Sequence, residues 1–95
     1  MFAQLIGKAL RFIGRKAYSE DGLISIHNHS FTNEPEFLSA YGRGVEACGC
    51  DYHFRWRVYV GLWAARHATQ IRGDFVECGV NKGFMSSAVM QHLDR

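Results

Sequence analysis

The segment that decides the predicted fold reads FVECGVNKGF from Phe75 to Phe84. Residues 74–78 are typical of a short strand, residues 79–83 of a loop bounded by glycines, and residues 84–93 have the spacing of a helix. A long helix is expected just before them, over residues 52–71. Helix, strand, glycine loop and helix in this order predict the beginning of an α/β doubly wound domain.

The acidic residue and the two glycines of this segment suit a small zwitterionic ligand. Glu77 would stand at the carboxyl end of the strand, where open α/β sheets bind ligands, and could accept hydrogen bonds from an ammonium group. Gly79 would let the backbone turn sharply and approach a ligand closely, because it has no Cβ atom. Gly83 would let the next helix start close to the strand. The combination favours a cofactor such as S-adenosylmethionine over a bare phosphate.

Residue order excludes two phosphate-binding motifs. A P-loop needs its lysine directly after the second glycine, whereas Lys82 precedes Gly83. A dinucleotide fingerprint needs glycines at its first, third and sixth positions, which here are Gly79, Asn81 and Phe84.

The surviving pattern, Glu-x-Gly-x-x-x-Gly after a strand, resembles motif I of class I methyltransferases. The stretch GDFVECGV from Gly73 to Val80, preceded by a helix rich in tryptophan and arginine, resembles the macrocin O-methyltransferase family. The resemblance is clearest from Asp51 onward and looser over residues 37–41. It implies a Rossmann-like methyltransferase fold, with the N-terminal helices forming a cap, that uses S-adenosylmethionine to methylate a hydroxyl of a sugar or another small molecule.

The same resemblance implies a set of residues near the methionine end of the cofactor. These are Glu77, Cys78, Gly79, Val80, Asn81, Gly83 and Ser86. The acid that holds the cofactor ribose, the ligands of a divalent metal and the catalytic base would follow Arg95, so no residue here is assigned as catalytic. The chain departs from the family where Asn81-Lys82 replaces an aromatic-arginine pair and Phe84-Met85 replaces small residues.

A lone strand cannot form a sheet, because its backbone groups and both its faces need partners. We therefore expect an incomplete domain, inactive alone, with residues 1–50 as a helical cap segment and residues 51–95 as the start of the methyltransferase domain.

Composition sets broad limits on function. The chain has 95 residues, and its formal charge of +2 is too small to indicate nucleic-acid binding. The chain has three cysteines, Cys48, Cys50 and Cys78. A secreted disulfide scaffold of this size normally has more cysteines and an even number of them, so a cytoplasmic location is expected. The N-terminus lacks a signal-peptide pattern, and no apolar run reaches the roughly 20 residues of a membrane span.

Helical periodicity is also expected at the N-terminus, over residues 2–17. One face is apolar and the opposite face carries Lys8, Arg11 and Arg15. Such a helix could lie on an anionic membrane surface, but packing on its own protein or on a partner is favoured. Assembly into a homo-oligomer is a separate alternative that stays open. The apolar positions are Phe2, Leu5, Ile6, Ala9, Leu10 and Ile13.

Local signals mark the other elements. Asp21-Gly22 predicts a turn, and Asn33 offers an N-cap for a helix that carries Pro35 in its first turn and stops near residues 42–44. Asp51 is a candidate cap for the long helix, and Gly73 is its expected left-handed stop. The apolar stripe of that helix consists of Phe54, Val58, Gly61, Leu62, Ala65 and Ala68.

Two alternatives without catalysis remain open. A zinc-binding module could use clustered histidines and cysteines, although Cys-x-Cys is tighter than the usual ligand spacing. A small scaffold could dimerise through Trp56 and Trp63. The zinc candidates are His27, His29, Cys48, Cys50 and His53.

Overall fold

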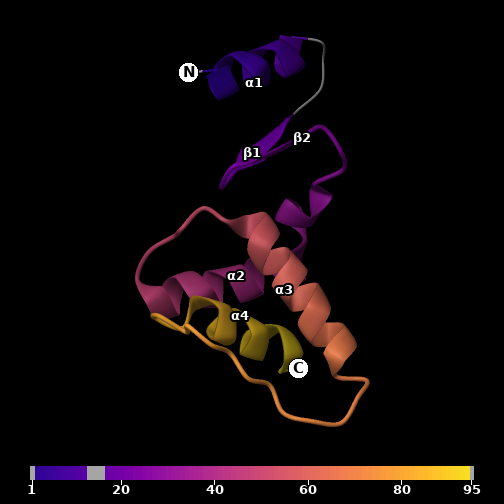
Figure 1. The fold of residues 1–95 in the computed structure, drawn as a ribbon, viewed down its shortest axis with the longest axis vertical. Helices are drawn as coiled ribbons and strands as arrows, with labels where there is room; N and C mark the ends of the chain where they lie inside the picture. Colours follow the sequence, from indigo (N-terminus) through magenta and orange to yellow (C-terminus); the bar gives the residue numbers. More distant parts are fainter. Residues whose placement is uncertain (1, 13–16, 95) are drawn as a thin grey trace. The chain divides into compact units, whose positions relative to one another are not determined.

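The computed structural model describes residues 2–12 and 17–94 of the chain. The chain divides into two compact units, Met1–Ser30 and Phe31–Arg95, and each is described by itself. The elements in chain order are α1 (Phe2–Phe12), β1 (Tyr18–Glu20), β2 (Leu23–Ser25), the 3-10 helix η1 (Ser30–Asn33), α2 (Pro35–Cys48), α3 (Arg55–Ala68) and α4 (Phe84–Leu93) (Figure 1).

The first unit holds α1 and a two-stranded antiparallel hairpin. Asp21 and Gly22 both have positive φ, 53° and 78°, which is the geometry of the two-residue turn that joins twisted strands, so the predicted turn is confirmed. Helix α1 ends at Phe12, while the rest of the helix expected over residues 2–17 includes residues 13–16, which lie outside the described part. Phe2 and Leu5 of its expected apolar face are exposed.

Helix α2 is longer than the sequence predicted. Pro35 stands in its first turn as expected, but Glu34 is the N-cap residue, and Asn33 belongs to η1. The predicted stop at residues 42–44 is wrong: the helix continues to Cys48 and ends at Gly49, which has a φ of 86° and donates its N–H to the Val45 carbonyl. The helix continues past residues 42–44 because of tertiary packing: Gly44 lies against Phe84 of another helix and is not a helix-terminating glycine.

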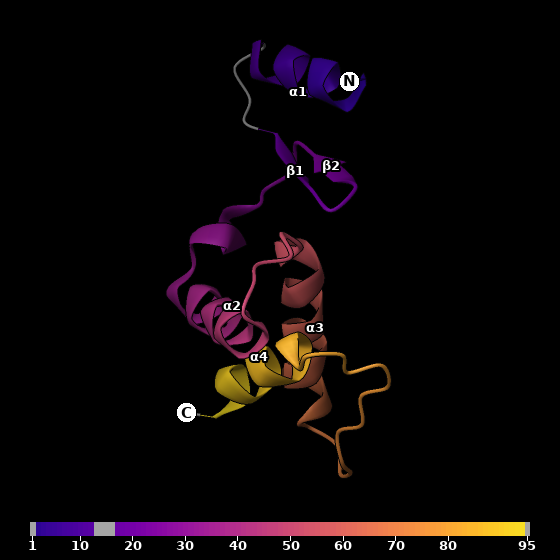
Figure 2. The ribbon, with the colours of Figure 1, turned by 90° about the vertical axis from the view of Figure 1, so that its left-hand side faces the viewer.

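Helix α4 packs against α2 and, less extensively, against α3 (Figures 1 and 2). A Cβ atom placed on Gly44 would lie 2.5 Å from the ring of Phe84, so glycine is what permits this close approach. Phe84 is buried at the first position of α4, with its ring centroid 4.9 Å from that of Phe54 and 5.1 Å from that of Tyr41. Helix α4 therefore completes the aromatic core of the second unit.

Helix α3 presents the predicted apolar stripe to this core. Val58, Leu62 and Ala65 are buried, and α4 begins and ends where helical spacing predicted. Asp51 is not the cap of α3, because Phe54 occupies that position. Gly73 does not stop the helix either: α3 ends at Ala68, where the Thr69 hydroxyl donates to a carbonyl of the last turn.

The strand expected over residues 74–78 is not formed. In the part of the chain that the structure describes, the only ladder is the β1–β2 hairpin, so this segment has no strand to pair with. Phe75 is 59% exposed and Val76 is 86% exposed. The described chain is mostly helical, and an α/β domain beginning here remains an expectation.

The division into a cap segment and a methyltransferase domain at residue 50 stays a prediction, while the compact units divide at residue 30. Helix α2, expected in a cap segment, shares one core with α3 and α4. No helix of the described residues is both long and apolar enough to cross a membrane.

Candidate functional site

The segment between α3 and α4 owes its path to a series of left-handed residues. Gly79, Asn81 and Gly83 have φ values of 68°, 55° and 82°. Glycine adopts this region freely and asparagine tolerates it better than most residues, so the sequence is suited to these turns. The N–H of Gly83 donates to the carbonyl of Val80 at 3.0 Å, which closes the last turn before α4.

This loop, α3 and α4 line a groove with a volume of about 1110 Å³. Figures 1 and 2 show the loop leaving the end of α3 and returning to the start of α4. The walls are mainly apolar, with a few polar groups among them. The loop contributes Phe75, Val76, Glu77 and Val80; α3 contributes Gly61, Ala64, Ala65 and Ala68; α2 contributes Arg43; and the α4 region contributes Met85, Ser86, Ser87, Val89, Met90, Gln91, Leu93 and Asp94.

The groove brings together some of the predicted cofactor residues. Glu77 and Val80 line it from the loop, and Ser86 lines it from the first turn of α4. The remaining predicted residues, Cys78, Gly79, Asn81 and Gly83, do not line it. Gly79 has open space within 4 Å of where a Cβ atom would stand, so the structure requires glycine there for its φ and not for a close contact within the chain.

A second cluster, centred on Cys48 and Cys50, lies where α2 ends. The Sγ atoms of the two cysteines are 3.5 Å apart, and Cys48 is only 9% exposed. The Tyr52 hydroxyl donates a hydrogen bond that lowers the pKa of Cys48; burial works against it, and the thiol and amide of Cys50 and the charge of Lys82 lower it further. The same bond to Cys48, followed by burial and by the interaction with Cys50, raises the pKa of Tyr52 to about 12. We call Cys48, Cys50 and Tyr52 the thiol cluster.

Asp51, next to this cluster, anchors the connection from α2 to α3. Its carboxylate accepts hydrogen bonds from the Tyr41 hydroxyl and from the backbone N–H of His53. Burial works to raise the pKa of Asp51, but these two bonds and the charges of His53 and Arg55 hold it below its ordinary value.

The zinc candidates do not assemble into a ligand set in the described residues. Among residues 2–12 and 17–94, no group of three or more histidine, cysteine, aspartate or glutamate side chains is placed to hold a metal ion. His53 Nδ1 lies 3.8 Å from a carboxylate oxygen of Asp51, and the Nδ1 atom of His29 is hydrogen bonded to the carbonyl of His27.

Sequence reasoning missed two features of these sites. Arg43 lines the groove from α2, 34 residues before Glu77, and no local pattern indicated that approach. Lys82 interacts electrostatically with Cys48, although the two are far apart in sequence. The Cys-Gly-Cys spacing itself was a usable signal, since a left-handed glycine between two cysteines can turn both thiols to one side.

Comparisons with known proteins add no family to this description. No protein-family model matches the chain, and neither a search of curated proteins nor a search of solved structures produced a significant match.

Proposed function

We propose that this chain provides the first cofactor-binding segment of an S-adenosylmethionine-dependent methyltransferase that acts on a hydroxyl of a sugar or another small molecule. One observation carries the proposal: Glu77, Val80 and Ser86, drawn from the methyltransferase-like motif and from the helix after it, line one groove. The volume of the groove, about 1110 Å³, is slightly above the roughly 300–1,000 Å³ that is typical of small-molecule sites.

The polar and apolar groups of this groove fit the methionine end of the cofactor. The Glu77 carboxylate offers an acceptor for the ammonium group, and the Ser86 hydroxyl offers both a donor and an acceptor. Phe75, Val76 and Met90 give an apolar wall for the aliphatic part of the ligand. When bound, S-adenosylmethionine supplies a methyl group activated by its sulfonium. No residue of this chain is assigned to the removal of the acceptor proton.

Other parts of the proposal concern cell location and assembly. We infer a reducing cytoplasm as the compartment, because three cysteines are fewer than a secreted disulfide scaffold of this size carries and are odd in number. The exposed apolar residues of the groove suit further polypeptide that would cover them, from the same protein or from a second copy.

Replacing Glu77 by glutamine tests the proposal. In a polypeptide that contains this chain and binds S-adenosylmethionine, Glu77→Gln should weaken that binding about ten- to hundredfold, because a charge-assisted hydrogen bond worth about 1.5–3 kcal/mol is removed. The thermal midpoint should stay unchanged, because Glu77 is exposed and glutamine keeps its volume. Calorimetric titration and thermal unfolding of the same sample measure both quantities.

Asp74→Asn is the matched control, since Asp74 is an exposed carboxylate three residues earlier that does not line the groove. It should leave affinity unchanged. Equal affinity of the wild type and Glu77→Gln for S-adenosylmethionine would reject the cofactor role of Glu77. Equal losses of affinity in Glu77→Gln and Asp74→Asn would also reject it, because they would indicate a general effect of charge. The 95-residue chain alone should bind weakly or not at all, because it offers only one cofactor-binding loop.

A further inference from the structure

The two cysteines that follow one another around Gly49 are held together by the end of α2. Cys48 is the last residue of the helix, and Gly49 has a φ of 86°. Residues two apart on a regular helix point to nearly opposite sides, so the left-handed glycine is what turns Cys50 back toward Cys48. The resulting Sγ–Sγ distance is 3.5 Å. Closing a disulfide of about 2.05 Å needs the sulfurs to approach by roughly 1.5 Å.

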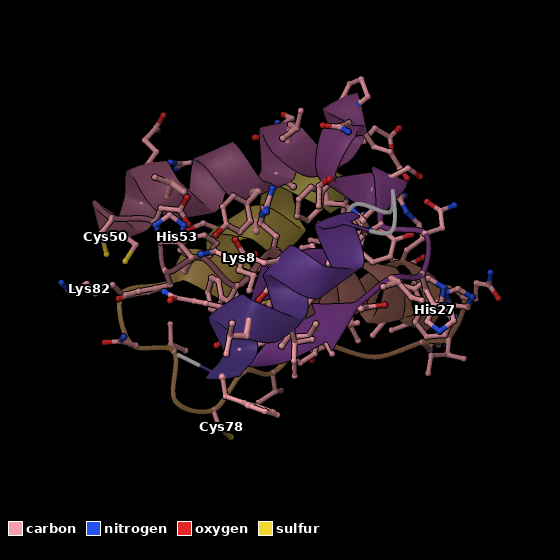
Figure 3. All side chains as sticks on the ribbon, turned by 90° about the horizontal axis from the view of Figure 1, so that it is seen from above. Lys8, His27, Cys50, His53, Cys78 and Lys82 are labelled. Carbon is pink, nitrogen blue, oxygen red and sulfur yellow. The ribbon has the colours of Figure 1, made fainter. Side chains whose placement is uncertain are left out.

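The two thiols differ in exposure and in their neighbours, which suits each to a different step of thiol exchange. Cys50 is exposed and can meet a reagent from solvent. Cys48 is buried beside it and receives hydrogen bonds from the Tyr52 hydroxyl and from Cys50, with the charge of Lys82 also favouring its anion. Figure 3 shows Cys50 and Lys82 on the same side of this unit, with Cys78 standing apart from them. We assign the exposed Cys50 as the entry cysteine and the buried Cys48, whose ionised form is favoured by its neighbours, as the resolving cysteine.

We propose that Cys48 and Cys50 are a redox-active pair that forms an intramolecular disulfide by exchange with a low-molecular-weight disulfide such as oxidised glutathione. The Cys50 thiolate attacks one sulfur of the small disulfide, forming a mixed disulfide and releasing one thiolate. The Cys48 thiolate then attacks the Cys50 sulfur, the mixed disulfide breaks, and a second small thiolate leaves. The protein loses two electrons and two protons, and the small disulfide becomes two thiols.

This inference is independent of the proposed methyltransferase function, because it needs neither the groove nor the cofactor. Its consequence for the loop is local: the disulfide removes the Cys48 thiol, whose ionised form the charge of Lys82 favours. The redox state of the pair is thereby coupled to a charged residue of the glycine loop.

The test is carried out on the 95-residue chain in a Cys78→Ser background, which removes the other exposed thiol. The reduced protein is mixed with oxidised glutathione at neutral pH, quenched with acid at intervals, and analysed by intact mass and peptide mapping. We expect the product to be two hydrogens lighter, with the bond mapped to Cys48 and Cys50. The observed rate at which the mixed disulfide at Cys50 decays should exceed the observed rate at which it forms by about tenfold or more, because the resolving sulfur is adjacent.

Two variants distinguish this mechanism from general thiol reactivity. In Cys48→Ser, the reaction should stop at a stable mixed disulfide on Cys50. In Tyr52→Phe, closure should slow by roughly threefold or more, because Cys48 loses the donor that stabilises its thiolate. Far-ultraviolet circular dichroism confirms that each variant keeps its helices, and the wild type alone decides the proposal if a variant does not fold.

Three results would overturn the proposal. The first is a stable mixed disulfide on Cys50 of the chain that retains both cysteines. The second is that Cys48 and Cys50 both stay reduced under conditions that oxidise a simple dithiol. The third is retention of a zinc ion that keeps both thiols unreactive until a chelator is added, which would assign the pair to metal binding instead.

Discussion

Asp51 shows how a single carboxylate ties the end of one helix to the beginning of the next. It accepts the Tyr41 hydroxyl from α2 and the N–H of His53 just before α3. Its pKa is lower in the folded chain than the unfolded value of about 3.9. The ionised form is therefore favoured by folding, and the stability it adds is fully present above the unfolded pKa and is lost as the pH falls through the folded pKa.

In Asp51→Asn, the free energy of unfolding should therefore fall less steeply with decreasing pH than in the wild type. We expect the variant to be less stable than the wild type at pH 6 and to approach it only as the pH falls through the lowered pKa of Asp51, where the carboxylate becomes protonated. Tyr41→Phe should reduce the same pH dependence in part, because it removes one donor and keeps the ring. Urea unfolding monitored by circular dichroism across this range measures the difference, and parallel curves for wild type and Asp51→Asn would contradict the assignment.

At the scale of the element, the two glycines in the middle of α2 have opposite roles. A Cβ atom on Gly44 would stand 2.5 Å from the buried ring of Phe84 and 3.0 Å from its carbonyl oxygen. A Cβ atom on Gly42 would meet nothing within 4 Å. The same residue type is thus required at one position and replaceable two residues earlier.

Gly44→Ala should destabilise the chain, because an overpacking cost of about 1–3 kcal/mol exceeds the roughly 0.5–1 kcal/mol that alanine contributes to a helix. Gly42→Ala should instead stabilise it by about 0.5–1 kcal/mol. Thermal unfolding of the two variants side by side checks the opposite signs. Stabilisation of both would mean that α4 does not pack on α2 as closely as described.

At the scale of the whole molecule, the exposed apolar residues along the groove are expected to decide whether the chain binds hydrophobic dyes and associates in solution. Val76 is 86% exposed, and Phe75 and Met90 on the same groove are exposed as well. An apolar surface of this kind binds hydrophobic dyes and favours association.

We therefore expect the chain to enhance the fluorescence of an anilinonaphthalene dye and to sediment faster as its concentration rises. Val76→Ser should reduce both effects. Val60→Ser is the matched control, because Val60 is also exposed but lies on α3 away from the lining of the groove. Equal reductions in the two variants, or no dye binding by the wild type, would show that the groove is not the responsible surface.

Local chemistry was sufficient to predict several elements of this protein. The Asp21-Gly22 turn needs only two residues that accept positive φ, and α4 has the predicted bounds because its apolar spacing is continuous from Phe84 to Leu93. The stripe on α3 followed from the same periodicity. Glu77, Val80 and Ser86, which the resemblance to a methyltransferase motif implied, lie along one groove, and their role in cofactor binding stays a prediction.

Contacts between distant residues decided the rest. Gly44 continues a helix because Phe84 packs on it, and residues 74–78 form no strand because a strand exists only with a partner to share its backbone hydrogen bonds. The thiol cluster and its interaction with Lys82 required the end of α2 to meet the glycine loop. Periodicity and turn chemistry act within a few residues, whereas close packing, strand pairing and the charge around a thiol depend on which segments the fold brings together.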